Sequence, residues 1–357
     1  MLALRWHGRG DVRLDDIPAP EPPPSGWLQL EVIACGICGT DVEEYLHGPT
    51  FIPHAEPNRL TGAVAPIVLG HEIAGRVVAV GLGTPDFAIG DVVGVDGLMG
   101  CGRCSSCSRG AVNLCDSLAA VGLMSDGGLA ERVNVRADTC VKIPAGAAAD
   151  TGALAETLAV AVRALRRGRL AEGERVVIFG AGAVGLFALQ AARAMGASQV
   201  AVVEPHAHRR ALALELGASA AWPPGAEVGE ADVVVECSGV PDAFAAALSF
   251  TRRGGRLVLV GVSTVPVAVS PMDIVAGERE VIGSLSHLRK SDFAAAVELL
   301  VSGAVRTDGI VSSRIPLAHA LDDGLLALVR EPERHVKILV VPPTSDEAVP
   351  ERRAFQA

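Results

Sequence analysis

The sequence predicts an α/β protein in two parts, an irregular β-rich domain followed by a doubly wound parallel sheet. A chain of 357 residues is long enough for about two domains, at roughly 100–200 residues each. Hydrophobic residues make up 50% of it and no long run of like charges interrupts them, which excludes a globally disordered chain. Over residues 151–290, apolar stretches alternate with helix-like stretches, as is typical of a parallel sheet covered on both faces.

The first domain is expected to consist of short strands. Residues 1–150 are rich in Gly and Pro, and turn signals recur roughly every ten residues, which suits an irregular β domain or barrel. Short β segments are expected at 28–32 and 75–80.

The rest of the chain is expected to alternate strands with helices. Buried apolar runs predict strands at 176–179, 199–204, 232–237, 256–260 and 281–285, with helices between them at 184–195, 206–216 and 242–250. A further helix is expected at 291–302, and strands at 310–315 and 336–341. We divide the chain into residues 1–153, 154–290 and 291–357, the last part returning to the first domain and ending in a tail.

Charge and composition exclude several classes of partner. With 31 basic and 41 acidic residues the net charge is −10, and aromatic residues are only 3%, which argues against a nucleic-acid-binding protein. No apolar stretch reaches 18 residues, so no membrane span is expected. Arg5, Arg9 and Asp11 interrupt the N-terminus, which does not resemble a secretory signal. These features predict a cytoplasmic protein whose eight cysteines are metal ligands or core residues rather than disulfides.

A predicted strand runs into a predicted helix through the motif Gly180-x-Gly182-x-x-Gly185. The first glycine permits a tight turn, the second lets the backbone approach a pyrophosphate, and the third lets the helix pack closely on the strand. A glycine-rich turn alone is weak evidence, but here the flanking strand and helix accompany it. The motif predicts a dinucleotide site that includes Val184.

The type of dinucleotide depends on the residues that follow. Glu204 ends the next predicted strand, where a carboxylate accepts the ribose 2′-OH and repels a 2′-phosphate. We therefore predict NAD as the cofactor, with Ser238 and Arg209 also lining its site. NADP is the alternative, because Arg209 and Arg210 are near enough in sequence to pair with a phosphate.

Four cysteines, Cys101, Cys104, Cys107 and Cys115, form the pattern C-x2-C-x2-C-x7-C in a Gly- and Ser-rich stretch at about 97–117. Four thiolates at this spacing close tetrahedrally on one ion and leave no position for a substrate, so the pattern predicts a structural zinc ion. Four unrelated thiols and a nucleic-acid-binding zinc ribbon are the alternatives, and the acidic chain disfavours the second.

A second constellation lies in the same β-rich region. Cys38 and Thr40 belong to the segment GICGTD, and His71 and Glu72 belong to GHE. One thiolate, one imidazole and one carboxylate would form an open zinc site suited to catalysis. Each residue alone is a weak signal, and the combination with the four-cysteine pattern and the dinucleotide motif makes it specific.

The order of these motifs resembles that of the zinc-containing medium-chain dehydrogenase/reductase family, along essentially the whole chain. The resemblance implies a GroES-like catalytic domain and a Rossmann domain. Residues 44–53, 60–62 and 69–72 are similar to the bacterial 2,3-butanediol dehydrogenase branch, whose neighbours are sorbitol and threonine dehydrogenases.

The resemblance also implies site residues and partners. Cys38 and His71 would bind the catalytic zinc, Glu156 would be the acidic third ligand, directly or through water, and Glu72 would be the exchangeable carboxylate beside it. With the four-cysteine site this makes two zinc ions per chain. A small-molecule alcohol or ketone substrate is implied, and relatives are commonly homodimers or homotetramers.

Two positions depart from the pattern of the branch. Thr157 stands where a proline is usual, a mild backbone change that leaves Glu156 in place. Glu43 stands where the branch usually has a histidine that carries the substrate proton outward. We therefore list Glu43 with Thr40 as a candidate for the proton relay, with solvent exposure without function as the alternative; His47 is a less favoured substitute.

Further residues have weaker readings. Cys35, Cys140 and Cys237 are interpreted as buried small apolar residues. Tyr45 is interpreted as a wall of the substrate pocket rather than a catalytic phenol, and His287 as a neighbour of the nicotinamide and of subunit contacts.

The implied reaction is hydride transfer between a secondary alcohol and NAD. The substrate class is a vicinal diol or polyol such as 2,3-butanediol, whose proton would leave through Thr40 and the ribose hydroxyls. One alternative is a polyol, cyclitol or other secondary-alcohol dehydrogenase of a specialised pathway. The other is a non-catalytic nucleotide-binding protein, which the presence of Cys38, His71 and Glu156 disfavours.

Overall fold

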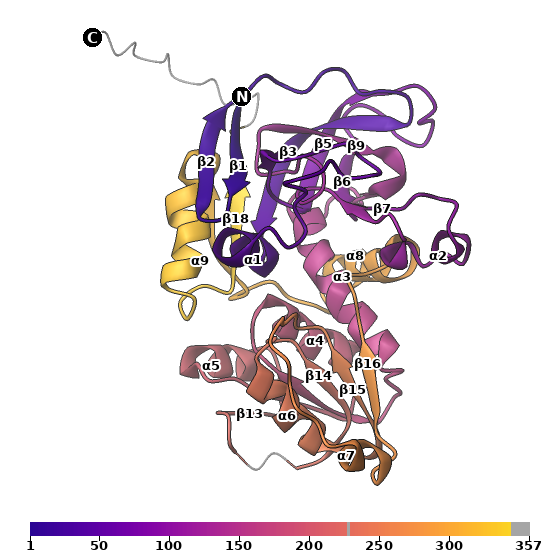
Figure 1. Cartoon of the computed structure of the whole chain (residues 1–357), viewed down its shortest axis with the longest axis vertical. Coiled ribbons are helices and arrows are strands. Elements are labelled where there is room, and N and C mark those ends of the chain that lie inside the picture. Colours follow the sequence, from indigo (N-terminus) through magenta and orange to yellow (C-terminus); the bar gives the residue numbers. More distant parts are fainter. Residues whose placement is uncertain (227–228, 344–357) are drawn as a thin grey trace.

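The computed structural model describes residues 1–226 and 229–343. Two domains lie one above the other and are joined by the long helix α3 (Thr151–Arg167) and by the segment that follows strand β16 (Glu280–Gly283) (Figure 1). This confirms the predicted α/β fold with a GroES-like domain and a parallel-sheet Rossmann domain. The end of the predicted C-terminal tail, residues 344–357, lies outside the described residues.

The catalytic domain is built around one seven-stranded sheet and one three-stranded sheet. The larger sheet has the order β10 (Cys140–Lys142), β6 (Val92–Val95), β5 (Glu72–Val80), β3 (Trp27–Ile37), β18 (Lys337–Val341) and β17 (Val311–Pro316), with β9 (Arg132–Arg136) also on β3. The smaller has the order β2 (Asp11–Asp16), β1 (Leu2–Gly8) and β4 (Ile67–Val68), and β7 (Leu98–Met99) pairs with β8 (Ala119–Ala120).

Strand β3 organises this domain because it pairs with β5 and β18 as well as β9. Gly36 is opposite Glu72 of β5, and Ile37 is opposite Ile338 of β18. This register brings the C-terminal strand to the end of β3, next to Cys38. The strands predicted at 28–32 and 75–80 are the central parts of β3 and β5.

The Rossmann domain is a six-stranded parallel sheet. Its strand order is β13 (Ala220–Trp222), β12 (Gln199–Val203), β11 (Arg175–Phe179), β14 (Ala231–Glu236), β15 (Thr251–Leu259) and β16. The direction of winding changes between β11 and β14, and Phe179 pairs with both Val203 and Glu236, so the three carboxyl ends lie in line. In such sheets the ligand crevice lies at this switch point.

The helices flank the sheets and connect them. They are α1 (Gly39–His47), α2 (Ser105–Ser108), α4 (Ala183–Ala194), α5 (Ala207–Glu215), α6 (Pro241–Phe250), α7 (Pro271–Val275), α8 (Ala294–Val301) and α9 (Leu326–Arg330). Shorter helical segments are η1 (Val112–Leu114), η2 (Ala137–Thr139), η3 (Arg289–Phe293), η4 (Leu317–His319) and η5 (Ala320–Leu325). The elements predicted for residues 176–341 agree with these bounds to within a few residues, apart from three segments, and short elements such as β13, α7 and α9 were not predicted.

The three differences have local causes. Helix α3 was not predicted, although Asp150 is a residue type that favours a helix start; residues 151–159 are all buried, so no alternation of an apolar and a polar face marks its first turns. Strand β15 begins at Thr251 instead of 256, because a register irregularity lets Thr251 pair with Ala231 before the main ladder begins at Arg256. The helix predicted at 291–302 begins with the π-helical turn η3 and becomes α-helical only at Ala294.

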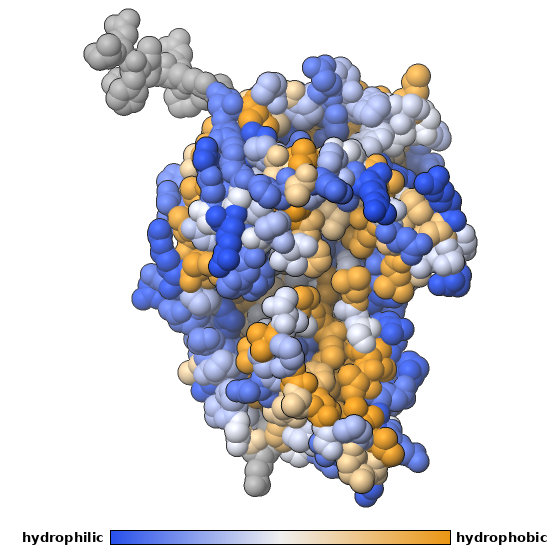
Figure 2. All heavy atoms as spheres, in the orientation of Figure 1, coloured by the Kyte–Doolittle hydropathy of each residue, from blue (hydrophilic) through white to orange (hydrophobic). Residues whose placement is uncertain are grey.

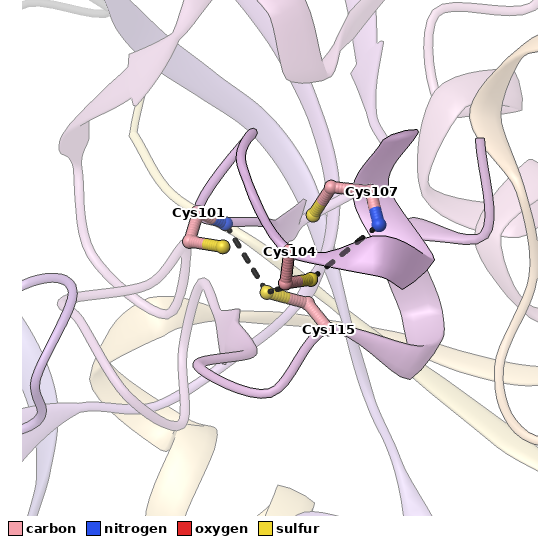
Figure 3. A group of neighbouring side chains, drawn as sticks. All are labelled: Cys101, Cys104, Cys107 and Cys115. Carbon is pink, nitrogen blue, oxygen red and sulfur yellow. Dashed lines mark hydrogen bonds between the residues drawn. The ribbon is translucent and has the colours of Figure 1, made fainter. Parts of the chain in front are cut away.

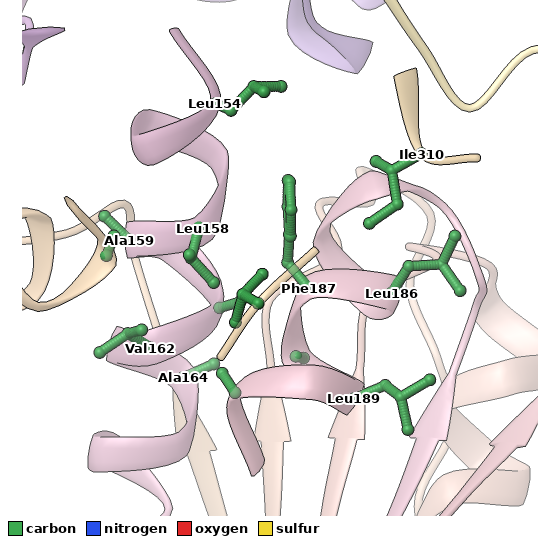
Figure 4. Packing of buried hydrophobic residues seen from close by; sticks show 14 of the residues in the cluster. Leu154, Leu158, Ala159, Val162, Ala164, Leu186, Phe187, Leu189 and Ile310 are labelled. Carbon is green, nitrogen blue, oxygen red and sulfur yellow. The ribbon is translucent and has the colours of Figure 1, made fainter. Parts of the chain in front are cut away.

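Helix α3 carries the packing between the two parts of the molecule. Its side chains are buried along most of its length, and Leu158 and Val162 lie in one apolar cluster with Leu186 and Phe187 of α4 (Figure 4). Each fully buried side chain of this size contributes roughly 1.5–3 kcal/mol. This packing fixes the position of Glu156, which α3 also carries.

Candidate active site

Three candidate ligands converge where β3 and β5 lie side by side. Cys38 follows β3 and is the N-cap of α1, while His71 and Glu72 are at the start of β5. One ligand atom from each of the three lies within 4.8 Å of those of the other two. The antiparallel register of Gly36 with Glu72 explains why residues so far apart in sequence meet.

Asp41 orients both the cysteine and the histidine. Its Oδ2 accepts a hydrogen bond from the backbone N–H of Cys38 at 2.9 Å, and its Oδ1 lies 3.8 Å from His71 Nδ1. Asp41 is fully buried, and burial raises the pKa of its carboxyl group. A carboxylate behind a ligating histidine is a common orienting arrangement in metal sites.

The three residues fit a zinc ion. A thiolate, an imidazole and a carboxylate are ligands that zinc accepts, and three ligands leave a position for a substrate. Among the described residues, Glu72 Oε2 is buried without a hydrogen-bond partner. Buried polar atoms without a partner are rare, so this unpaired carboxylate oxygen in the group of three indicates a site for an ion.

Glu156 takes a different place from the one that the resemblance implies. It lies on α3 outside the group of three, and its Oε1 is 3.6 Å from Nδ1 of His287. Burial raises the pKa of Glu156. The geometry thus places Glu72, rather than Glu156, beside Cys38 and His71. Both carboxylates remain candidates for the acidic third ligand of the ion.

Lys337 is a site residue that sequence reasoning missed. Its Nζ lies 2.5 Å from Glu72 Oε1 and donates to the carbonyl of Ile37 at 3.3 Å, and both charged side chains are buried. Burial would raise the pKa of Glu72, but the Lys337 ammonium and the His71 imidazole together outweigh burial and hold the pKa below its ordinary value. No spacing in the sequence signals a pair between strands at the two ends of the chain.

Helix α1 and the segment after it border this group. Thr40 Oγ1 lies 3.7 Å from Cys38 Sγ, whereas Glu43 is exposed on the outer face of α1. Tyr45 is half-buried and packs against the apolar core of the domain. Glu44 was also missed: it is fully buried, and its carboxylate accepts the N–H groups of Thr50 and Phe51 at 3.0 and 2.5 Å, which fixes the segment after α1.

The four-cysteine pattern closes into a compact lobe. The four sulfur atoms lie within 4.8 Å of one another, and those of Cys104 and Cys115 are 3.8 Å apart (Figure 3). A tetrahedral zinc ion with bonds of about 2.3 Å places its sulfur ligands about 3.8 Å apart. Backbone N–H groups of Cys107 and Asp116 lower the pKa of Cys104 to about 6, which favours its thiolate. The lobe therefore fits a closed structural site.

The dinucleotide motif forms the turn between β11 and α4. A Cβ at Gly185 would lie 1.9 Å from the carbonyl oxygen of Gly180, so only glycine permits this close packing of helix on strand. Gly182 is the N-cap of α4, its missing side chain faces open space, and no side chain caps the helix. Free N–H groups beside open space form an anion site that fits a pyrophosphate. Val184 is half-buried in the first turn of α4.

The residues around this turn are held by hydrogen bonds. The buried carboxylate of Glu204 accepts the N–H groups of Ala181 at 2.7 Å and His206 at 2.9 Å. Ser238 is exposed, and its N–H donates to Glu236 at 2.7 Å. Arg209 donates to the carbonyl groups of Pro332 and His335, and Arg210 donates to those of Glu204 and Pro205.

Comparison with known proteins agrees with this architecture. Residues 24–145 match the alcohol dehydrogenase GroES-like domain, and residues 183–302 match the zinc-binding dehydrogenase domain. The chain is 36% identical to (R,R)-butanediol dehydrogenase of Bacillus subtilis over 353 residues, covering 96% of this chain and all of the relative. The chain belongs to the zinc-containing medium-chain alcohol dehydrogenase family.

Other relatives of this alcohol dehydrogenase support the same assignment. Sorbitol dehydrogenase of Bos taurus is 33% identical over 90% of this chain and 91% of its own. The crystal structure of the Bacillus subtilis butanediol dehydrogenase superposes with a TM-score of 0.88 at 35% identity, over 96% of this chain and 99% of that one. A zinc-binding dehydrogenase from Sinorhizobium meliloti, bound to NADP, has a TM-score of 0.85 at 34% identity, over 96% and 99% of the two chains.

The chain is therefore a zinc-dependent alcohol or polyol oxidoreductase that uses a nicotinamide cofactor. Within residues 1–226 and 229–343, none of the helices of this dehydrogenase has both the length and the apolar character needed to cross a membrane.

Proposed function

We propose that this dehydrogenase interconverts a vicinal diol or polyol of the 2,3-butanediol type and its ketone, with NAD. The observation that carries the proposal is the group Cys38, His71 and Glu72, which offers three ligands and leaves a position open. The names of the similar proteins, butanediol and sorbitol dehydrogenases, favour a substrate with neighbouring hydroxyl groups. When bound, zinc supplies Lewis acidity and NAD accepts the hydride.

The side chains of the site would act as follows. Cys38, His71 and Glu72 hold the ion, with Glu156 close by, and Asp41 keeps the imidazole in place. Lys337 neutralises much of the charge of Glu72, so the ligands leave more of the ion's positive charge for the substrate oxygen. Thr40, next to Cys38, would accept the substrate's hydroxyl proton while giving its own proton to the ribose hydroxyls, from which a proton leaves to solvent.

A substrate panel tests the proposed function. We expect turnover of 2,3-butanediol and of acetoin, with kcat/KM above that for sorbitol and cyclitols. Activity on a cyclitol or sugar alcohol with none on either butanediol or acetoin would assign the enzyme to another pathway. Stoichiometric binding of NADH without turnover of any alcohol would instead indicate a non-catalytic protein.

We expect kcat/KM for NAD to exceed that for NADP by at least about tenfold, or about 1.4 kcal/mol. Glu204 directly follows β12 beside the turn that would receive the pyrophosphate, and its charge repels a 2′-phosphate. Arg209 and Arg210 donate to backbone carbonyl groups, so their guanidinium groups are already engaged. Steady-state kinetics with both cofactors measures the ratio, and a preference for NADP would show that an arginine leaves its carbonyl partner for the phosphate.

A pH profile tests the relay role of Glu43. Because a carboxylate accepts protons at lower pH than a histidine does, Glu43→His is expected to move the acid limb of the kcat/KM profile to higher pH. Glu43→Gln is expected to slow oxidation, since an amide takes up no proton. The exposed position of Glu43 on α1 suits the outer end of a relay. Superimposable profiles for the wild type and both variants would remove Glu43 from the mechanism.

We also propose that the enzyme is a cytoplasmic homo-oligomer. Within the described residues, β16 is an edge strand with one side unpaired, and Figure 2 shows apolar side chains gathered on the same side of the Rossmann domain. Unpaired edges beside apolar surface favour pairing with a second copy. Over residues 262–285, which include α7 and β16, the exposed large apolar residues are Val262, Val265, Met272, Val275, Val281 and Leu285. Sedimentation of a single species with the mass of one chain would contradict this proposal.

A further inference from the structure

His287 is fully buried and joins three parts of the molecule. It lies on the segment that leaves β16 of the Rossmann sheet. Its Nε2 is 2.6 Å from Oδ1 of Asp96, which follows β6 of the catalytic domain. Its Nδ1 is 3.3 Å from Oγ of Ser286 and at ion-pair distance, 3.6 Å, from Oε1 of Glu156 on α3. None of the residue is exposed, so His287 offers no surface to a substrate.

The surrounding backbone fixes the orientation of this imidazole. Ser286 has φ +49°, a left-handed conformation that residues with a side chain rarely adopt. The His287 ring packs against Phe293, with ring centroids 5.8 Å apart. Asp292, which is buried, accepts hydrogen bonds from Arg163 at 3.3 Å and Arg166 at 2.8 Å, and so anchors the segment to α3. Such strain persists only where the surroundings enforce it.

Glu156 has two possible partners in this environment. One is an ion held by Cys38, His71 and Glu72, and the other is the imidazole of His287. In the structure its carboxylate lies near His287 and outside the group of three ligands. Without the imidazole as a partner, the buried Glu156 carboxylate would move to the neighbouring ion. It would then be a fourth protein ligand, and four protein ligands form the closed shell of a structural site.

We propose that His287 is a positioning residue that keeps the Glu156 carboxylate from closing the metal site. Asp96 lies on the Nε2 side of the imidazole and fixes the ring, and Glu156 lies on its Nδ1 side. The imidazole thus keeps the Glu156 carboxylate away from the ion, which leaves the fourth position for the substrate oxygen. Because His287 belongs to the segment that leaves the Rossmann sheet, the cofactor domain thereby contributes to the geometry of the metal site. The inference rests on the metal site of the proposed function.

Three substitutions of His287 distinguish the roles of the two imidazole nitrogens. His287→Phe removes both, His287→Asn keeps an amide near the place of Nδ1, which faces Glu156, and His287→Gln keeps one near the place of Nε2, which faces Asp96. We expect His287→Phe to raise KM for the diol and to lower kcat/KM by about 10–100-fold, the range for groups that orient metal ligands. The same variant should release zinc to a chelator more slowly than the wild type, and His287→Asn should reverse both effects better than His287→Gln.

A cycle with Glu156→Gln tests whether His287 acts through Glu156. In the Glu156→Gln background, His287→Phe should change neither zinc release nor the visible spectrum of the cobalt-substituted enzyme, whereas in the wild-type background it should change both. Asn113→Ala is the matched control, since Asn113 Nδ2 donates to the carbonyl of Leu285 at 2.8 Å and so ties the same segment without touching Glu156.

Three results would each overturn the proposal. The first is faster zinc release from His287→Phe than from the wild type, and the second is equal rescue by Asn and Gln. The third is that His287→Phe has the same effects in the Glu156→Gln background as in the wild-type background. Chelator kinetics and the cobalt spectrum need no substrate. They therefore give a result for His287 even if no diol proves to be turned over.

Discussion

Cys38→Ser is expected to lower kcat for diol oxidation by about 10³-fold or more and to reduce the zinc content from two ions per chain to one. The thiolate is one of three converging ligands, and a serine hydroxyl is not deprotonated at neutral pH. Loss of the ion removes the Lewis acid, which stabilises the developing charge by several kcal/mol, and each 1.36 kcal/mol is about tenfold in rate. Elemental analysis of the purified variant and its steady-state kinetics measure the two effects.

Cys35→Ala is the matched control for this substitution. Cys35 lies three residues earlier on β3 and is fully buried in the core of the domain, and burial raises the pKa of its thiol well above the ordinary value. The control should keep both ions and most of the activity. If Cys38→Ser kept two ions and normal kcat while Cys35→Ala lost one, the assignment of the ligand would be wrong.

The parts of the site that the sequence predicts are those encoded within short segments. The dinucleotide turn is one continuous run from β11 into α4, and the four cysteines of the lobe lie on one loop, so spacing alone describes their geometry. The residues Cys38, His71 and Glu72 come from two separate segments. In the sequence, only the order of the motifs along the chain indicated that they form one site.

Contacts between distant segments could not be predicted in this way. Lys337 meets Glu72 because β18 pairs with β3, and a β-ladder between the two ends of a chain leaves no periodic signal. The position of Glu156 near His287 depends equally on how α3 packs between the domains. For the same reason the strands of the Rossmann sheet, which read as apolar runs, were easier to predict than the start of α3.

Cys104→Ser is expected to remove the other zinc ion and to lower the melting temperature by about 5–10 °C, the equivalent of a few kcal/mol. The lobe has little apolar core of its own: Leu114 is 53% exposed, and Cys115 is the one buried thiol of the four. The zinc ion therefore stabilises the lobe in place of an apolar core, and its binding free energy contributes directly to the folding free energy of this segment. Differential scanning calorimetry, with hydrogen exchange to locate the loss of protection within residues 97–117, measures the effect.

The two cysteine variants control for one another because each should lose a different ion. Cys104→Ser is expected to keep kcat within about twofold, since a closed four-thiolate shell offers no position to a substrate. Cys38→Ser is expected to keep the melting transition of the lobe. If either substitution removed both ions, the two sites would depend on each other. The hydrogen bond from Asn113 to the carbonyl of Leu285 would then be the contact that links the lobe to the active site, because Leu285 lies two residues before His287.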